Sequence, residues 1–223
     1  KVAHWLRMSA EGTYDYDVDA RFYDAETDSW SNVITPHKDG VSAEHGFVAM
    51  LPVGEGNTLI SWLDGRNTRT ETGYGQMTLR AGLFNNRGET LSEWELDSRV
   101  CDCCQTSAAM SAAGPIIVYR DRSAAEIRDI YVTRYVDGIW TSPVAIHDDE
   151  WRIAGCPVNG PSVAAEGKFV AVGWFTAKGD SPRVKLALSS DNGEHFSEPI
   201  MVAGPDTIGR IDTAILASGE VAV

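Results

Sequence analysis

The sequence predicts an all-β protein built from a repeated sheet of about four short antiparallel strands. First, apolar strands end in an aromatic residue at intervals of 57, 57 and 55 residues, namely Trp5, Trp62, Tyr119 and Trp174. Second, another aromatic anchor follows each of these after 21 to 32 residues, namely Trp30, Trp94, Trp140 and Phe196. Third, turn dipeptides such as Asn-Gly at 192–193 separate runs with period-two alternation, as in 183–190. A repeat of roughly 55 residues with four strands is typical of one blade of a β-propeller.

The repeats divide the chain in order. They lie near residues 1–42, 43–100, 101–154 and 155–208, and residues 209–223 start a further blade within a single domain, 1–223. In the second repeat, the strands from the axis outward are expected in the segments HGFVAMLP, TLISWLDG, MTLRAGLF and ETLSEWEL. The chain opens and stops inside the second strand of a blade, so we expect a segment of a longer propeller, a four-bladed ring, or an oligomer that closes the circle. An open blade edge favours a homo-oligomer.

Composition excludes some partners. The chain has 223 residues and a formal net charge of -13 at pH 7. Such an acidic surface repels nucleic-acid phosphates and anionic lipid, so we expect no nucleic acid as a partner. No stretch is long and apolar enough for a membrane span, so we expect no membrane insertion.

Four cysteines have an unusual distribution, because three of them lie within four residues: Cys101, Cys103, Cys104 and, apart from these, Cys156. These positions begin adjacent blades, so Cys103 or Cys104 is expected to face Cys156. Free buried thiols or a disulfide are the preferred interpretations, and a disulfide would fit an extracellular or periplasmic protein. A soft metal such as zinc or copper is an alternative, although the spacing matches no zinc motif. We expect no other cofactor.

The octapeptide SSDNGEHF, residues 189–196, is expected to join the third strand of a repeat to the fourth. Asp191 can accept backbone N–H bonds within the turn, Gly193 permits a positive φ, and Phe196 packs back under the turn. This segment resembles the Asp-box of the sialidase-like propellers (the bacterial neuraminidase repeat family). The resemblance, together with the repeat, covers essentially the whole chain and implies a six-bladed propeller of which this chain holds part.

Loops on one face of a propeller converge around its axis, and these loops hold the unusual polar residues. The loops that enter the innermost strand contain His45, Asn159 and Arg210, and those after the second strand contain Arg66, Asp121, Arg122 and Arg128. Guanidinium groups bind carboxylates bidentately, so a single positive patch for a small anionic ligand or glycan is expected there. For any single arginine, a solvated ion pair is the competing interpretation. Asp64 and Asp121 would then brace their turns, and His45 would be a packed histidine.

The resemblance implies a particular chemistry. Sialidases bind the substrate carboxylate with three arginines and use a tyrosine nucleophile assisted by a glutamate, with an aspartate as acid/base. Carried onto this sequence, Tyr74 with Glu71 would form the nucleophile pair and Asp121 would be the aspartate. The chain would then be a sialidase-like exo-glycosidase acting on an anionic or neutral glycan. The alternative is a non-catalytic propeller that binds a glycan, a metal or a protein partner.

Overall fold

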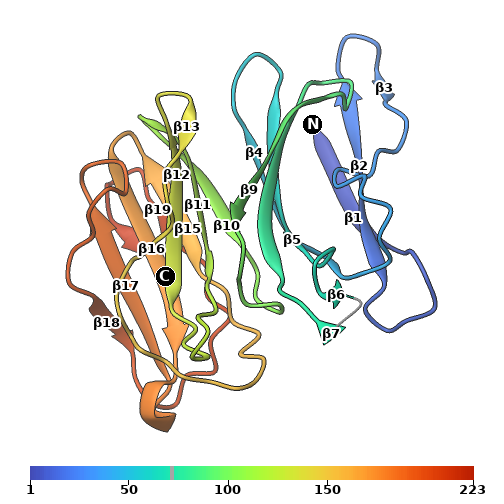
Figure 1. Ribbon diagram of the computed structural model, residues 1–223. Helices are drawn as coiled ribbons and strands as arrows, with labels where there is room; N and C mark the ends of the chain where they lie inside the picture. The colour runs from blue at the N-terminus through green and yellow to red at the C-terminus, as the bar shows by residue number, and fades with distance from the viewer. Residues whose placement is uncertain (71–72) are drawn as a thin grey trace. The chain divides into compact units, whose positions relative to one another are not determined.

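The structure is a computed structural model that describes residues 1–70 and 73–223. The chain divides into two compact units, Lys1–Arg99 and Val100–Val223. Strands dominate both units (Figure 1), and among the described residues the only helical segment is the 3-10 turn Lys178–Asp180. None of these residues forms a helix long and apolar enough to cross a membrane. The predicted all-β class is confirmed.

The N-terminal unit contains one three-stranded and one four-stranded antiparallel sheet. The first has the order β1-β2-β3, with β1 Val2–Met8, β2 Tyr16–Asp24 and β3 Ser29–Trp30. The second has the order β4-β5-β8-β9, with β4 His45–Pro52, β5 Thr58–Asp64, β8 Thr78–Phe84 and β9 Thr90–Asp97. A small hairpin, β6 Arg69–Thr70 and β7 Gly73–Tyr74, follows β5. The four strands expected for the second repeat are therefore confirmed in identity and order.

The C-terminal unit repeats the same arrangement. One sheet has the order β10-β11-β12-β13, and β14 also pairs with β12. Its strands are β10 Ser107–Ser111, β11 Gly114–Arg120, β12 Ile130–Val136, β13 Ile139–Trp140 and β14 Val144–Ala145. The next sheet has the order β15-β16-β17-β18, with β15 Ser162–Glu166, β16 Phe169–Thr176, β17 Arg183–Ser189 and β18 Ile200–Ala203. A last pair comprises β19 Ala214–Ile215 and β20 Val221–Ala222. Each complete sheet is a meander of the kind that forms a propeller blade.

The aromatic anchors explain how the sheets pack. Trp62, Tyr119 and Trp174 lie on the second strand of their sheets and are at most 1% exposed. Trp5 lies on the corresponding strand but is 39% exposed, because β1 is an edge strand of its sheet. Leu6 and Met8 on the same strand are also exposed. An apolar unpaired edge favours pairing with another chain, which is the physical basis of the predicted homo-oligomer.

The Asp-box-like hairpin between β17 and β18 has the expected internal bonds. The Asp191 carboxylate accepts the backbone N–H groups of Glu194 and His195 at 3.1 and 3.0 Å, and Ser189 Oγ accepts that of Gly193 at 3.0 Å. Gly193 has a φ of 75°, as expected. Phe196 is only partly buried, although it packs against the core of this unit. The hydrogen bonds to ionised Asp191 hold the pKa of that carboxyl well below its usual range.

Candidate functional site

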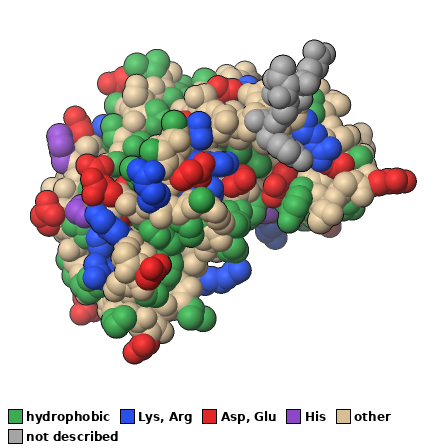
Figure 2. Space-filling model, turned by 60° about the horizontal axis from the view of Figure 1, so that its bottom comes forward, with side chains coloured by type: hydrophobic (Ala, Val, Ile, Leu, Met, Phe, Trp, Pro, Cys, Tyr) green, Lys and Arg blue, Asp and Glu red, His purple; other side chains and the backbone are tan. Residues whose placement is uncertain are grey.

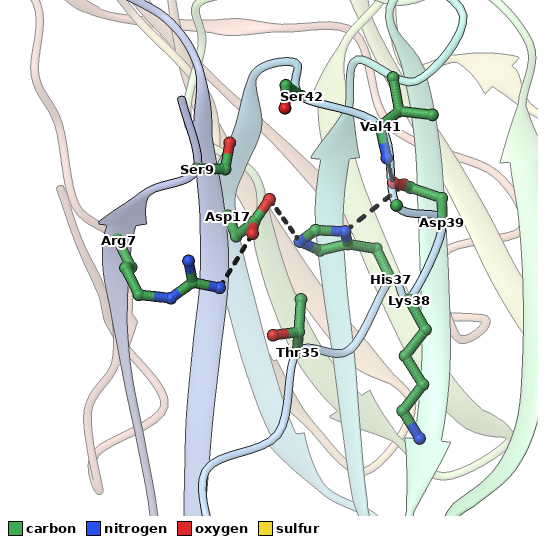
Figure 3. Close-up of a pocket in the computed structure, with 10 residues that line it drawn as sticks. Arg7, Ser9, Asp17, Thr35, His37, Lys38, Asp39, Val41 and Ser42 are labelled. Carbon is green, nitrogen blue, oxygen red and sulfur yellow. Dashed lines mark hydrogen bonds and ion pairs between the residues drawn. The ribbon is translucent and has the colours of Figure 1, made fainter. Parts of the chain in front are cut away.

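A polar pocket of about 420 Å³ opens in the N-terminal unit (Figure 3). Its walls come from the end of β1, the start of β2 and the segment between β3 and β4. The lining side chains are mainly charged or hydroxylated: Arg7, Ser9, Asp17, Thr35, His37, Lys38, Asp39, Val41 and Ser42, with Gly40. Asp39 shapes its own loop, because its Oδ1 accepts the backbone N–H of Val41 at 2.8 Å. The volume is that of a small-molecule site rather than of a packing defect.

Paired strands place one cation and two carboxylates on the same wall. Arg7 on β1 lies opposite Asp17 on β2 in the strand register. Arg7 Nη2 donates to Asp17 at 2.9 Å and its Nε donates to Asp19 at 2.7 Å. Thr35 Oγ1 also donates to Asp19, at 2.9 Å. The Arg7 side chain remains about half exposed, so these bonds orient its guanidinium beside the pocket without burying it.

Two stacked histidines form the buried floor behind the pocket. The rings of His37 and His45 are parallel, with centroids 3.8 Å apart. His37 Nε2 accepts the backbone N–H of Val18 at 3.3 Å, and its Nδ1 lies 3.4 Å from Asp39 Oδ2. Burial, and then the charge of His45, lower the pKa of His37, so this ring is neutral with its proton on Nδ1.

His45 is in the opposite protonation state. Its Nε2 lies 2.9 Å from Asp39 Oδ2, and its Nδ1 lies 3.2 Å from the carbonyl oxygen of Ala43. Both ring nitrogens thus face acceptors, which suits an imidazolium. Burial alone lowers the pKa of His45, but the hydrogen bond and charge of Asp64, with those of Asp39, raise it above its ordinary value. His45 is completely buried and supports Asp39 from behind, which agrees with the interpretation as a packed histidine.

Asp64 holds this network together. Its carboxylate accepts Trp62 Nε1 at 2.7 Å, and Arg66 through Nε at 2.8 Å and Nη2 at 2.7 Å. Burial raises the pKa of Asp64, but hydrogen bonds from His45, Arg66 and Trp62 outweigh it and hold the pKa well below its usual range. Asp64 therefore braces its turn, as one of the two sequence interpretations expected. Arg66 also lies 3.3 Å from Asp39, so its guanidinium pairs with the carboxylates of both Asp64 and Asp39.

Two sets of side chains here have the ligand spacing of a metal site. The donor atoms of Asp17, His37 and His45 lie within 4.8 Å of one another, as do those of Asp39, His45 and Asp64. Both sets share His45, and a metal bound there would have to displace a proton from its ring.

A tyrosine is paired with a glutamate elsewhere in the N-terminal unit. Tyr16 Oη donates to Glu44 Oε1 at 2.6 Å, and the two residues form an isolated parallel bridge. Burial, and then the hydrogen bond to Glu44, raise the pKa of Tyr16 above its usual range. These two residues precede Asp17 and His45 in the chain. No local sequence pattern indicates this pair, because its members are 28 residues apart and meet only through the bridge between two segments.

The predicted nucleophile pair is Tyr74 with Glu71. Glu71 is outside the described residues, and of Tyr74 only the backbone is described, in the hairpin β6–β7. Asp121, the predicted aspartate, belongs to the C-terminal unit and lines a separate cavity of about 230 Å³. Asp129, Asp148 and Glu150 line the same cavity, so it is strongly acidic. The catalytic roles of these three residues stay predictions.

In the C-terminal unit, the predicted arginines meet carboxylates rather than an open pocket. Arg122 and Arg128 both pair with Glu126, at 2.9 and 3.0 Å, and both lie within 3.8 Å of Asp102. The Arg128 side chain is only 4% exposed. Figure 2 shows basic and acidic side chains next to one another on the face in view. The guanidinium groups of Arg122 and Arg128 thus already have anionic partners.

Asn159 and Arg210 belong to a hydrogen-bonded brace in the same unit. The buried Arg120 donates to the carbonyl oxygen of Asn159 through Nε at 2.9 Å and Nη2 at 2.8 Å. Asn159 Oδ1 accepts the backbone N–H of Arg210 at 2.9 Å. The Arg120 guanidinium also lies 5.0 Å from the ring centroid of Trp151. The structure thus gives Asn159 a bracing position, while the Arg210 residue is exposed.

The cysteines form both of the structures that the sequence analysis preferred. Cys103 and Cys156 are joined in a disulfide, and Cys101 and Cys104 are free and buried. The sulfur atoms of Cys101, Cys103 and Cys104 lie within 4.8 Å of one another, so this is also a group with the spacing of a metal site.

Comparison with known proteins shows likeness of fold. No protein-family model matches the chain, and no curated protein matches it. An ulvan lyase from a new family of polysaccharide lyase, solved bound to GlcA(1-4)Rha3S, is similar with a TM-score of 0.54 and 12% identity over 95% of this chain. A mutant of the Aleuria aurantia lectin in complex with Fucα1-6GlcNAc is similar with a TM-score of 0.51 and 13% identity over 91% of this chain.

The chain spans little more than half of either protein, 57% of the lyase and 56% of the lectin. At this identity the likeness establishes the fold, the propeller-like arrangement of antiparallel sheets. Function has to be argued from the site.

Proposed function

We propose that this protein binds a glycan in the pocket of its N-terminal unit. The observation that carries the proposal is the lining of that pocket, which contains both hydrogen-bond donors and hydrogen-bond acceptors. Arg7 and Lys38 donate hydrogen bonds, Asp17 and Asp39 accept them, and Ser42 can do both. A sugar hydroxyl also donates and accepts, so such a lining matches a hydroxyl-rich ligand. The two similar folds, a polysaccharide lyase and a lectin, support the same class of ligand.

The cations favour an anionic sugar among glycans. Arg7 is half exposed beside the pocket, and Lys38 is exposed at its rim. A carboxylate or sulfate on the sugar would gain a charge-assisted hydrogen bond from Lys38, because the Arg7 guanidinium is already bonded to Asp17 and Asp19. The buried acidic groups Asp19 and Asp64 are already neutralised by Arg7 and Arg66, so they repel such a ligand less than their number suggests.

As a finer proposal, the protein is an exo-glycosidase of the sialidase-like type, in which Tyr16 rather than Tyr74 is the nucleophile. The Tyr16–Glu44 hydrogen bond supports this assignment. Glu44 would take the phenol proton as Tyr16 Oη attacks the anomeric carbon, which avoids presenting an anionic nucleophile to an anionic sugar. Tyr16 and Asp17 are consecutive on β2 and point to opposite faces of the sheet, so a carboxyl group other than that of Asp17 would protonate the leaving group as the acid/base.

Binding is tested on a glycan array that holds neutral, carboxylated and sulfated glycans. We expect the full chain to bind, and Asp17→Asn to weaken binding by about tenfold, since it removes a charged acceptor and keeps the shape. Lys38→Ala is expected to weaken only the anionic glycans. Glu26→Gln, an exposed change in the same unit, is the control. Absence of binding by the parent chain, or equal loss in the control, would refute the proposal.

Catalysis is tested separately with aryl-glycosides that include sialosides. Tyr16→Phe is expected to lower kcat by at least about 100-fold while glycan binding persists, because only the attacking oxygen is removed. Binding without turnover by the parent chain would favour the non-catalytic alternative.

A soft metal at the cysteines is a second hypothesis that requires reduction of the disulfide. With Cys103 bonded to Cys156, only Cys101 and Cys104 have free sulfurs, whereas a structural zinc site takes four ligands. Zinc or copper bound by reduced protein but not by oxidised protein, measured by elemental analysis after dialysis, would support it.

A further inference from the structure

The four cysteines lie in two layers of different accessibility. The disulfide Cys103–Cys156 reaches the surface, because Cys156 is exposed and Cys103 is partly so. Beneath it, Cys101 and Cys104 are at most 1% exposed. The glycan proposal uses none of these four residues, so a function of the cysteines is independent of it.

The free thiols are within reach of the disulfide. Cys101 Sγ lies 3.7 Å from Cys103 Sγ and 3.5 Å from Cys104 Sγ. These distances are near van der Waals contact between sulfurs. Cys101 and Cys104 also have the Cys-x-x-Cys spacing that lets two thiols close into a disulfide.

The surroundings favour a thiolate on Cys101. Arg128 Nη1 donates to Cys101 Sγ at 3.1 Å, and Cys101 and Cys104 share an S–H···S hydrogen bond of 3.5 Å. The hydrogen bond with Cys104 contributes most, and with the charge of Arg128 it outweighs burial and lowers the pKa of Cys101. The same hydrogen bond, with burial, raises the pKa of Cys104, which therefore keeps its proton. A nucleophile with a pKa near ambient pH is well suited to thiol–disulfide exchange.

We propose that Cys101 and Cys104 are a redox-active dithiol that exchanges with the surface disulfide Cys103–Cys156. In the first step, the Cys101 thiolate attacks Cys103 Sγ; the Cys101–Cys103 bond forms, the Cys103–Cys156 bond breaks, and its electron pair leaves on Cys156. In the second step, Cys104 loses its proton to Cys156 or to water and attacks Cys101 Sγ, which forms Cys101–Cys104 and releases Cys103 as a thiolate. One disulfide exists before and after, so the exchange needs no oxidant or reductant.

The exchange makes an accessible thiol from a buried one. A disulfide that only staples two loops would keep Cys156 blocked, whereas exchange frees the Cys156 sulfur at the surface. A small disulfide in solution would then accept two electrons through the Cys156 and Cys103 thiolates. The source of these electrons is the buried pair, which is left oxidised as the Cys101–Cys104 disulfide. Arg128 acts through Cys101 and is a positioning residue.

The test is labelling of Cys156 by excess N-ethylmaleimide in the native full chain without reductant, followed by peptide mapping. Asp-N cleavage before Asp102 separates Cys101 from Cys103 and Cys104. We expect Cys156 to be labelled and a disulfide to appear within 101–104. Cys101→Ser is expected to abolish labelling, and Arg128→Met, which keeps all four cysteines, to slow it by about tenfold through the lost thiolate stabilisation.

Arg152→Met is the matched control, because Arg152 is exposed and in the same unit. It should label like the parent chain, and circular dichroism checks that each variant is folded. The proposal would be overturned if Cys156 of the parent chain were not labelled. It would also be overturned if Cys156 were labelled equally fast in the parent chain and in the Arg128→Met variant.

Discussion

At the scale of single residues, the pocket depends on a buried charge that the sequence does not display. His45 lies between Asp39 and Asp64 on one side and the carbonyl oxygen of Ala43 on the other. Its charge compensates two buried carboxylates, and the neutral ring of His37 stacks on it. A neutral His45 would leave one of its ring nitrogens without a proton to donate.

His45 should therefore make the stability of the protein depend on pH. Its folded pKa lies above the unfolded value of about 6.5, so its contribution is fully present below that pH and is lost as pH rises through the folded pKa. We expect the free energy of unfolding of the parent chain to fall as the pH rises from the unfolded pKa of His45 through its folded pKa. The His45→Gln variant should not show this fall. Urea denaturation at several pH values measures both. The same slope in the two proteins would show that His45 is neutral.

At the scale of elements, the predictions from sequence succeeded where the signal was local. The strands β4, β5, β8 and β9 appear in the predicted order, because alternation and turn residues act within a few positions. The Asp-box-like hairpin succeeded for the same reason: Ser189, Asp191 and Gly193 bond within one turn.

The parts of the site that were not predicted come from segments without such a signal. The stretch between β3 and β4 shows no periodicity, yet it supplies His37 and Asp39 to the pocket. The Tyr16–Glu44 pair forms across 28 residues, whereas proximity in sequence pointed to Tyr74 and Glu71. The loops were correctly identified as carriers of arginine, but their carboxylate partners, such as Glu126 for Arg128, depend on the folded geometry.

The Asp-box-like hairpin between β17 and β18 is predicted to stabilise the fold rather than to bind a ligand. Asp191→Ala removes the acceptor of two backbone N–H groups, and we expect a loss of about 1 to 2 kcal/mol in the free energy of unfolding, as for other lost side-chain caps. Glycan binding should be unchanged. Glu198→Ala, exposed near the same turn, serves as the control in chemical denaturation. Loss of glycan binding without loss of stability would instead place Asp191 at a ligand.

At the scale of the whole molecule, the two units are built from the same kind of antiparallel sheet but have different functional groups. The N-terminal unit has a pocket whose charges and hydroxyl groups match a sugar, and the C-terminal unit has a disulfide above a dithiol. Because the glycan and exchange proposals use separate residues, variants of one should leave the other intact. The Cys101→Ser variant should bind glycans on the array as the parent chain does.

The most direct test of the central claim, that the pocket of the N-terminal unit binds a glycan, is amide hydrogen–deuterium exchange of the full chain. It is measured with and without the array glycan that binds most tightly, at a saturating concentration. We predict slower exchange in peptides that cover residues 7–9 and 35–42, because these residues line the pocket, and unchanged exchange in Val100–Val223. Slower exchange confined to Val100–Val223 would contradict the account.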